Sequence, residues 1–354
     1  MNTSAFFHHD KPLFGLDIGY SSIKIMQIEW NNKRPVVTGY GVGDFDPKAI
    51  KDGVIVDPEA IARSAQALFG QRVVGEITSR RLAMGIPASR TYGRLIKLPK
   101  LATKDLPEAI RTEAEQYIPV PIDSLYMDYV VVSHTDKEME IFSVAVPKTI
   151  IDSYVTLSRL LGLEAVAMET TISAAARLFV QTNKTTEPTV LIDFGSRSSD
   201  ITIFDKTLIV TGTVPGGGDN ITASIADKLH VTPAEAYVIK VKYGLDHSKK
   251  QKEIAEALRP TLDQLLKEIR RMIRYYEERY GGEKKISQIV TMGGGANMPG
   301  LNEYLTELLR LPVRMSDPWQ HIGFSKLEPP STVERSLYVT VSGLALMSPK
   351  EVFA

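Results

Sequence analysis

A pattern of strand, tight turn and strand occurs twice in the chain, at residues 13–28 (LFGLDIGYSSIKIMQI) and at residues 189–204 (TVLIDFGSRSSDITIF). The two stretches align at an offset of 176 residues (189 minus 13), about half of the 354-residue chain. Apolar residues alternate on both sides of each turn, as in strands with a buried face. The aligned identities are Asp17 with Asp193, Gly19 with Gly195, Ser22 with Ser198 and Ile25 with Ile201. The repeat predicts two related α/β halves with a site in the cleft between them.

The size and composition of the chain limit its function. At roughly 150 residues per domain, the length predicts two to three domains. The 42 Lys and Arg residues balance the 42 Asp and Glu residues, so the net charge is zero. This balance argues against a polyelectrolyte partner such as nucleic acid or an anionic membrane surface. The absence of cysteine excludes a disulfide scaffold, a thiolate metal site, an iron–sulfur cluster and a cysteine nucleophile.

Neither end of the sequence predicts a membrane segment. Residues 1–12 are polar, and no run approaches the roughly 18 apolar residues that a membrane helix needs. Residues 348–354 lack the basic amphipathic pattern of a membrane-targeting helix. We therefore expect a soluble, cytoplasmic protein.

A small inserted subdomain is predicted between the two copies of the repeat. Its expected elements are a helix capped by Thr103, the two strands of a hairpin and a second helix, at residues 103–117, 125–134, 139–146 and 149–161. Together they predict an α+β subdomain over residues 80–163, inserted into the first half of the chain.

The second half contains a long amphipathic helix, predicted over residues 249–280. Its basic cluster of Arg270, Arg271 and Arg274 lies among tyrosines, a composition that also occurs in nucleic-acid patches. Glu268, Glu277 and Glu278 lie near the same cluster, which favours a solvated helix face instead.

The first copy of the repeat carries the groups that a polyphosphate needs. Asp17 lies at a strand end, and Gly19 permits a tight turn whose backbone N–H groups can line an anion site. Ser21 and Ser22 add hydroxyl groups. Lys24 follows Ser22 by two residues, so strand alternation puts both on one face, where they can meet the same phosphate.

The two aligned aspartates predict a metal site. Asp17 and Asp193 would flank a hydrated Mg²⁺ ion, which is usually held by one or two carboxylates together with phosphates. An ordinary glycine hairpin explains either copy of the repeat alone. The pair at half-chain spacing favours the shared nucleotide site.

Two glycine triplets each precede a predicted helix. The first precedes residues 219–229, and such a helix start can donate hydrogen bonds to an anion. The second follows a strand at 286–292 and precedes a helix at 299–311, so a flat ring and a ribose could lie against bare backbone. A structural turn explains either triplet equally well. The triplets are Gly216, Gly217 and Gly218, and Gly293, Gly294 and Gly295.

This order of hairpins and glycine turns resembles the actin-like ATPase superfamily, which includes actin, chaperone ATPases, sugar kinases, MreB and FtsA. Within it, EAEQYIPVPIDSLYMDYVV at residues 113–131 is similar to the signature of the PilM family of type IV pilus assembly. EIRRMIRYYE at 268–277 and MGGGANMPGLNEYL at 292–305 are also similar to that family. The resemblance spans residues 14–346.

The resemblance implies ATP and Mg²⁺ as ligands. The first phosphate loop would consist of Asp17, Gly19, Ser21, Ser22 and Lys24, and the second of Asp193, Gly195, Ser198 and Ser199. Lys240 and the two glycine triplets would border the ribose and the adenine. Asp17 and Asp193 would hold the metal and take part in any catalysis. Glu169 could orient a hydrolytic water, although a capping or salt-bridge role is favoured for it.

The implied fold is an actin-like (ribonuclease H-like) two-lobed α/β fold with an inserted α+β subdomain. The first lobe is expected at residues 12–79 and the insert at residues 80–165. The connecting helix of the first lobe is expected at residues 166–186, with its core at 170–179. The second lobe then spans residues 187–317, and the chain returns to the first lobe at residues 318–350. A counterpart of the connecting helix is expected at residues 336–346.

Two departures from the superfamily pattern argue against efficient hydrolysis. Arg197 lies in the second phosphate loop, where strongly active relatives tend to have glycine, so it either contacts a phosphate or crowds the loop. The segment AYVIKVKYG at residues 236–244 resembles an element of FtsA, but Tyr237 stands where an acid for the ribose is expected. We therefore expect ATP binding with weak or no ATPase activity.

The resemblance implies a cytoplasmic adaptor that binds the N-terminal peptide of a PilN-type membrane protein, in a groove between the insert and the first lobe. The protein would then lie at the inner face of the membrane only through this partner. Pilus motor ATPases and further copies of the chain are additional expected partners, and nucleic acid is not. The alternatives are an FtsA-like division protein and an actin-fold small-molecule kinase or ATPase.

Overall fold

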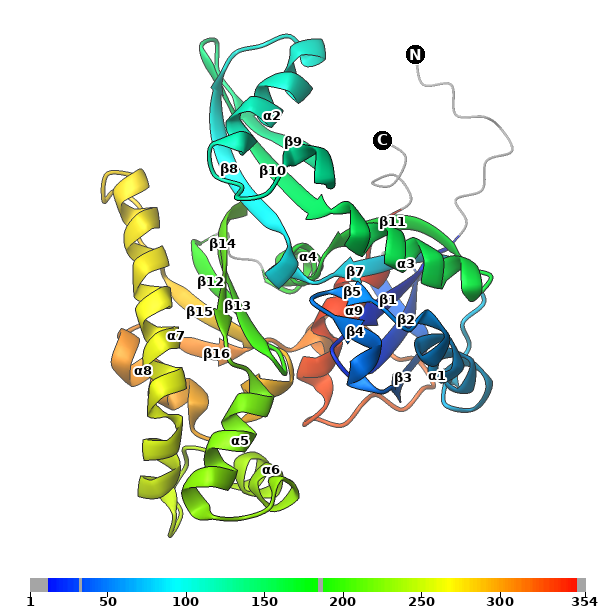
Figure 1. Ribbon diagram of the computed structural model, residues 1–354, viewed down its shortest axis with the longest axis vertical. Coiled ribbons are helices and arrows are strands. Elements are labelled where there is room, and N and C mark those ends of the chain that lie inside the picture. The colour runs from blue at the N-terminus through cyan, green and yellow to red at the C-terminus, as the bar shows by residue number, and fades with distance from the viewer. Residues whose placement is uncertain (1–11, 32–33, 184–186, 349–354) are drawn as a thin grey trace.

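Two β-sheets organise the protein (Figure 1). The computed structural model describes residues 12–31, 34–183 and 187–348, so the predictions made for residues 1–11 and 349–354 lie outside the described residues. The strands of the first sheet are β1 (Phe14–Ile18), β2 (Ser22–Asn31), β3 (Arg34–Asp44), β6 (Val74–Gly75), β7 (Arg81–Ile86) and β11 (Glu164–Thr170). Their order across the sheet is β11-β7-β1-β2-β3-β6.

The second sheet has eight strands. They are β8 (Tyr92–Pro99), β9 (Leu125–His134), β10 (Glu138–Pro147), β12 (Thr189–Phe194), β13 (Ser198–Asp205), β14 (Thr207–Pro215), β15 (Gln288–Met292) and β16 (Val313–Met315). Their order is β16-β15-β12-β13-β14-β8-β10-β9. A short ribbon of β4 (Ile50–Lys51) and β5 (Val54–Ile55) completes the strands of the described residues.

The two sheets repeat the same arrangement of strands. In the first, β1 pairs antiparallel with β2 and parallel with β7, and β7 pairs parallel with β11. In the second, β12 pairs antiparallel with β13 and parallel with β15, and β15 pairs parallel with β16. The order β11-β7-β1-β2-β3 therefore corresponds strand by strand to β16-β15-β12-β13-β14. The two related α/β halves predicted from the repeat are confirmed.

Helices cover both sheets. They are α1 (Pro58–Gln71), α2 (Leu106–Glu115), α3 (Lys148–Leu160), α4 (Thr171–Thr182), α5 (Gly218–Leu229), α6 (Pro233–Lys242), α7 (Gln251–Arg279), α8 (Leu301–Leu309) and α9 (Val339–Ala345). Figure 1 shows α7 along the side of the second sheet that faces away from the first lobe. In the described part of the chain, no helix is both long enough and apolar enough to cross a membrane.

The two helices α4 and α9 pack between the lobes and match the predicted connecting helices. Phe179 of α4 meets Phe204 of β13 edge to face, with ring centroids 5.6 Å apart, so α4 shares an apolar core with the second sheet. Against α9, the backbones approach so closely that a Cβ atom at Gly343 would overlap the carbonyl group of Ala174. Glycine at this position therefore sets the distance between the two connecting helices.

Replacing Gly343 by valine should strongly destabilise the protein, because overlap with backbone cannot be relieved by a side-chain rotation. We expect the free energy of unfolding to fall by about 3 kcal/mol or more. Gly70, near the end of α1, is the matched control, since a Cβ atom there meets no atom within 4 Å. Thermal unfolding of Gly343→Val and Gly70→Val measures the difference. Equal melting temperatures would contradict the close helix contact.

The inserted segment joins the second sheet, although it comes from the first half of the chain. Its strand β8 pairs with β14 at Arg94 and Val210, and Arg279 of α7 donates to the Glu140 carboxylate of β10 at 3.3 Å. The segment also has a small apolar core of its own, which includes Ile110. In Figure 1 the helix α2 and the strands β8 to β10 project above both lobes.

The insert is smaller than predicted, because some strands between the predicted boundaries at residues 80 and 165 belong to the first sheet. Strands β7 and β11 belong to the first sheet, and α3 packs into the apolar core of that lobe through Tyr154 and Leu157. The part that stands apart from the first sheet is therefore β8, α2, β9 and β10. The predicted hairpin of β9 and β10 is confirmed within that part.

The helix predicted from Thr103 begins later than expected. A 3-10 turn spans Thr103–Asp105, the α-helix α2 begins at Leu106, and the Thr103 side chain forms no cap. Pro107 explains the shift, because proline lacks an N–H group and is favoured in the first turn of a helix. Leu106, Ile110 and Ala114 form the buried face of this helix, at the spacing of four residues that places side chains on one side of a helix.

Candidate nucleotide site

The turns of the two matched hairpins have the same backbone geometry. The amide of Gly19 donates to the carbonyl of Ser22 at 2.8 Å, and at the aligned positions the amide of Gly195 donates to the carbonyl of Ser198 at 3.0 Å. The repeat in sequence is therefore a repeat in hydrogen bonding.

A buried lysine lies at the end of the first hairpin. Lys24 and Asp17 are register partners on β2 and β1, and the Lys24 Nζ atom lies 3.4 Å from Asp17 Oδ2 and 3.3 Å from Ser22 Oγ. The Asp17 and Lys24 side chains are each 10% exposed. The structure thus brings together the carboxylate, the hydroxyl and the ammonium group that the sequence places on one face. Ser21 is exposed in the turn, where its carbonyl accepts from the amide of Phe45.

The second hairpin places a carboxylate opposite the first. Burial, followed by the nearby Asp200 and Asp17 carboxylates, raises the pKa of Asp193 to about 7, while Lys24 acts in the opposite direction. Burial likewise raises the pKa of Asp200 to about 6, although a hydrogen bond from Thr213 at 2.6 Å opposes the shift. The influence of Asp17 and Lys24 on Asp193 means that the two hairpins face each other.

Where the two hairpins face each other, carboxylates outnumber cationic groups, which suits a metal ion. Asp17, Asp193 and Asp200 supply three carboxylates, and Lys24 is the cation among the groups that act on Asp193. Within the described residues, no group of three His, Cys, Asp or Glu side chains is placed to hold a metal on its own. A Mg²⁺ ion here would therefore take one or two carboxylates and complete its shell with water and phosphate oxygens, as Mg²⁺ does in nucleotide sites.

The raised pKa of Asp193 predicts a pH effect on the metal-free protein. Its pKa lies near 3.8 in an unfolded chain and about 7 when folded, so the folded state binds more protons between these values. Stability should therefore fall as the pH rises from about 4 through about 7. The Asp193→Asn variant lacks this loss, and we expect its melting temperature at pH 8 in EDTA to exceed that of the wild type by a few degrees. Melting curves between pH 5 and pH 8 test this, and parallel pH profiles would contradict it.

Not every predicted phosphate ligand reaches the site. Successive side chains of a strand point to opposite faces, so Ser198 shares the face of Asp200 and its register partner Asp193. Ser199 lies on the other face and is 4% exposed. The structure therefore does not bring the Ser199 side chain to the carboxylates.

The first glycine triplet supports the second hairpin. The amide of Gly216 donates to the carbonyl of Arg197 at 3.0 Å. The amide of Gly218 donates to the carbonyl of Gly195 at 2.9 Å, and the amide of Asp219 donates to the carbonyl of Ser196 at 2.8 Å. Gly217 is the residue that precedes α5. The predicted anion contact at this helix start meets a physical obstacle, because these N–H groups are already used to hold the hairpin turn.

Lys240 ties α6 to the start of α5. Its Nζ atom donates to the carbonyl of Gly218 at 2.9 Å and to the Thr222 hydroxyl at 2.8 Å, and it lies 4.9 Å from the centre of the Tyr237 ring. Burial lowers the pKa of Lys240, and the nearby Asp219 carboxylate partly offsets this. The lysine therefore lies beside the glycine triplet, where the resemblance places the ribose.

The second glycine triplet adjoins the Asp193 carboxylate. Gly293 has a φ angle of +79°, and a Cβ atom there would overlap the Asp193 carboxylate, so only glycine fits. Its amide donates to the carbonyl of Ser336 at 3.2 Å, which links this turn to the segment returning to the first lobe. Gly294 and Gly295 follow in a 3-10 turn. The sequence order of strand, glycine turn and helix thus brings bare backbone to Asp193.

Glu169 has an ion-pair partner. It lies in the same row of the first sheet as Asp17, since both are register partners of Gly85. Both of its carboxylate oxygens accept from the Arg177 guanidinium, one of them at 3.0 Å, and Arg177 also donates to the carbonyl of Gly343 at 3.1 Å. The salt-bridge role favoured for Glu169 is therefore the one that the structure provides.

One tyrosine near the site has no local sequence signal. Tyr154 of α3 is fully buried, and burial together with the Asp17 carboxylate raises the pKa of its hydroxyl. Among the described residues, that hydroxyl has no hydrogen-bond partner. Tyr154 occupies an apolar position of an amphipathic helix, so its sequence predicts only a core residue, and its proximity to Asp17 comes from packing.

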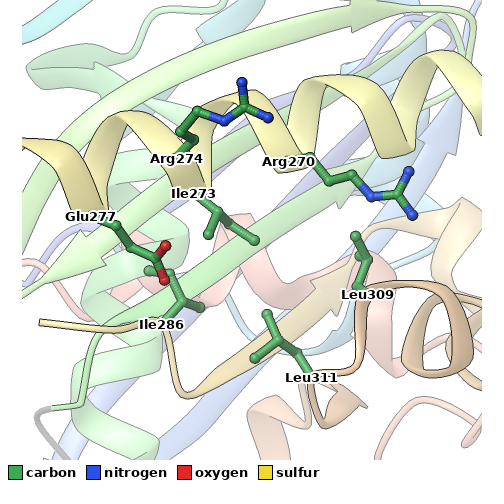
Figure 2. A pocket seen from close by; sticks show the side chains of 7 residues that line it. All are labelled: Arg270, Ile273, Arg274, Glu277, Ile286, Leu309 and Leu311. Carbon is green, nitrogen blue, oxygen red and sulfur yellow. The ribbon is translucent and has the colours of Figure 1, made fainter. Parts of the chain in front are cut away.

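A pocket of about 330 Å³ lies elsewhere, between α7, the end of α8 and the segment just before β15 (Figure 2). Ile273, Ile286, Leu309 and Leu311 form its apolar surface, with Arg270, Arg274 and Glu277 around it. Arg270 donates to the carbonyl of Leu308 at 3.0 Å. The pocket lies on α7, which faces away from the first lobe in Figure 1, so it is separate from the two hairpins.

Two matched lobes, each presenting an aspartate hairpin to the other and joined by paired central helices, define the actin-like ATPase fold. The chain belongs to the family of the type IV pilus assembly protein PilM, whose family model matches residues 15–349.

Relatives of known structure have the same fold. A structure described as the PilM-PilN type IV pilus biogenesis complex matches with a TM-score of 0.82 at 21% identity, covering 96% of this chain and 98% of that chain. MreB5 of Spiroplasma citri bound to AMPPNP matches with a TM-score of 0.56 at 12% identity, covering 95% of both chains. At these identities the likeness establishes the fold alone.

Cell division proteins are similar over most of the sequence. FtsA of Pseudomonas aeruginosa is 24% identical over 95% of this chain and 89% of its own length. FtsA of Bacillus subtilis is 23% identical over 87% of this chain and 79% of its own length. These are distant relatives within the same superfamily.

Proposed function

We propose that this protein is an ATP-binding adaptor of type IV pilus assembly, which binds the cytoplasmic N-terminal peptide of a PilN-type membrane protein. The observation that carries the nucleotide part is the buried Lys24 ammonium beside Asp17 and Ser22, facing Asp193 across the two hairpins. ATP would bridge the two lobes through its phosphates. It would favour the arrangement of the lobes that binds it more tightly, because a ligand shifts an equilibrium only through its different affinity for the two states.

The donor groups of the site fit a magnesium nucleotide. Lys24 would contact a phosphate, and Asp17 and Asp193 would hold Mg²⁺ through its water shell or directly. Bound Mg²⁺ would supply positive charge to the phosphate chain. The Gly293 turn and Lys240 would border the nucleoside. A nucleotide-bound MreB5 with the same fold lends support to this reading.

The same geometry favours binding over hydrolysis. The Glu169 carboxylate is engaged on both oxygens by Arg177, so orienting a water would first require breaking that ion pair. An acid that holds an attacking water needs a carboxylate oxygen within hydrogen-bond reach of it. We therefore expect slow or absent ATP turnover.

The peptide part rests on the inserted segment. The name of the matching PilM-PilN structure says that the PilM protein forms a complex with PilN. In this chain, β9 is the last strand of its sheet and exposes Tyr126, Val130 and Val131. An unpaired strand edge with exposed apolar side chains suits an extended peptide. Attachment to the membrane would then come through this partner, and pilus motor ATPases and further copies of the chain are additional proposed partners.

Calorimetry with Mg²⁺ and ATP, and fluorescence anisotropy with a labelled N-terminal peptide of the PilN-type protein from the same organism, test the two parts separately. We expect saturable binding in both experiments, with a scrambled peptide as the control. Released phosphate measures turnover in the same samples. Absence of ATP binding would overturn the nucleotide part, and equal binding of the scrambled peptide would overturn the adaptor part.

A further inference from the structure

The turns of the two hairpins touch each other through Tyr20 and Arg197. Tyr20 follows Gly19 in the first turn, and Arg197 is the last residue of the second turn, directly before β13. The central guanidinium carbon of Arg197 is 3.4 Å from the centroid of the Tyr20 ring, which is the distance of a face-on stack. The contact therefore joins the lobes at the turns that carry the proposed phosphate ligands.

The stack leaves the hydrogen-bonding edge of the guanidinium available. An arginine has five N–H donors, all in the plane of the group, and a ring under that plane engages none of them. Within the described residues, the Arg197 side chain has no hydrogen bond or ion pair, and it is exposed. Free donors of a permanent cation thus lie where the two hairpins meet.

The backbone around Arg197 explains why a side-chain donor is needed there. The carbonyls of Gly195 and Ser196 accept from the first two amides of α5, and the carbonyl of Arg197 accepts from the amide of Gly216 just before the helix, so those amides are not available to an anion. A helix start is otherwise a ready anion site. An arginine in the turn restores donors of the right kind, in the planar arrangement that matches a phosphate.

We propose that Arg197 binds the phosphate chain of the nucleotide and that Tyr20 positions its guanidinium. The inference rests on the proposed nucleotide binding. With Lys24 on the first hairpin, it provides two cations from opposite lobes for one polyphosphate. Because Tyr20 comes from the other lobe, the arginine is oriented only when the two hairpins face each other. The alternative, that Arg197 crowds the loop, predicts the opposite sign for its removal.

The first test compares nucleotides that differ in phosphate number. Calorimetry gives the affinity of ATP, ADP and AMP, and competition against a fluorescent ATP analogue gives that of adenosine. We expect Arg197→Ala to weaken ATP binding about tenfold or more, to weaken AMP binding less and to leave adenosine unchanged. Arg197→Lys should recover part of the loss. Arg63→Ala, which removes an exposed arginine of α1, is the matched control.

The second test isolates the positioning role of Tyr20. Tyr20→Phe keeps the ring and should bind ATP as the wild type does. Tyr20→Ala removes the ring and should weaken ATP binding severalfold, but should add nothing in the Arg197→Ala background, because the two residues act through one contact. Full additivity of the two substitutions would overturn the positioning role.

The outcomes separate the inference from the function on which it rests. If the wild type binds ATP and Arg197→Ala binds it equally or more tightly, the phosphate role is overturned while the proposed function stands. If the wild type binds no ATP, both are overturned. Because Arg197 is exposed, its substitution should leave the melting temperature nearly unchanged, and a melting curve checks this for each variant.

Discussion

The Lys24→Ala variant should bind ATP about 100-fold more weakly than the wild type. A charge-assisted hydrogen bond to a phosphate contributes about 1.5–3 kcal/mol, and each 1.4 kcal/mol is a tenfold change in affinity. Removing the ammonium also leaves Asp17 and Asp193 facing each other without the cation that offsets them, so an anionic ligand meets a more negative site. Isothermal titration calorimetry with Mg²⁺ present measures the change.

Two further variants separate charge from packing. Lys24→Met keeps the length of the aliphatic chain but has no charge, so it should lose affinity as Lys24→Ala does. Lys51→Ala removes an exposed lysine of β4 and should bind ATP normally. Unchanged ATP affinity in Lys24→Ala, with the protein folded by circular dichroism, would remove Lys24 from the proposed site.

Removing the projecting part of the insert should abolish binding of the PilN-type peptide and leave ATP binding in place. Tyr92 and Ala145 are register partners on β8 and β10, so a two-residue Asn-Gly turn can join these strands in place of residues 93–144. Strands β7 and β11 stay, which keeps the first sheet whole. Fluorescence anisotropy should then detect no peptide binding, while calorimetry should give an ATP affinity within about threefold of the wild type.

A point substitution tests the same surface without a deletion. Val130 of β9 is 65% exposed, and Val130→Glu should weaken peptide binding about tenfold by placing a charge in an apolar contact. Val238 of α6 is 57% exposed, and α6 lies at the opposite end of the molecule from β9 in Figure 1, so Val238→Glu is the matched control. Retained peptide binding in the deletion variant would locate the peptide site elsewhere.

Local patterns predicted most of the elements of this fold. The hairpins β1–β2, β12–β13 and β9–β10 follow from alternation around a turn, since the period of two is a property of the strand itself. The long helix predicted at residues 249–280 is α7, and its end residues differ by one or two positions. Helix ends are less certain because they depend on caps and on single residues such as Pro107.

Local patterns also mark several residues of the candidate site. Asp17 and Asp193 occur at aligned positions of a repeat, so the sequence itself marks them as a pair. Lys24 and Ser22 share a face because they are two apart in a strand. Ser199 is one residue beyond Ser198, and the same alternation turns it away from the site.

The repeat at an offset of 176 residues is enough to predict two related lobes, each with an aspartate hairpin. Other features become visible only in the folded chain: the insert extends the second sheet through β8, Arg177 engages Glu169, Tyr154 lies near Asp17, and Arg197 stacks on Tyr20. Strand alternation and turn chemistry act between neighbours in the chain, so they leave a periodic trace in the sequence. Contacts between residues that are far apart in the chain depend on how the lobes pack, and packing leaves no such trace.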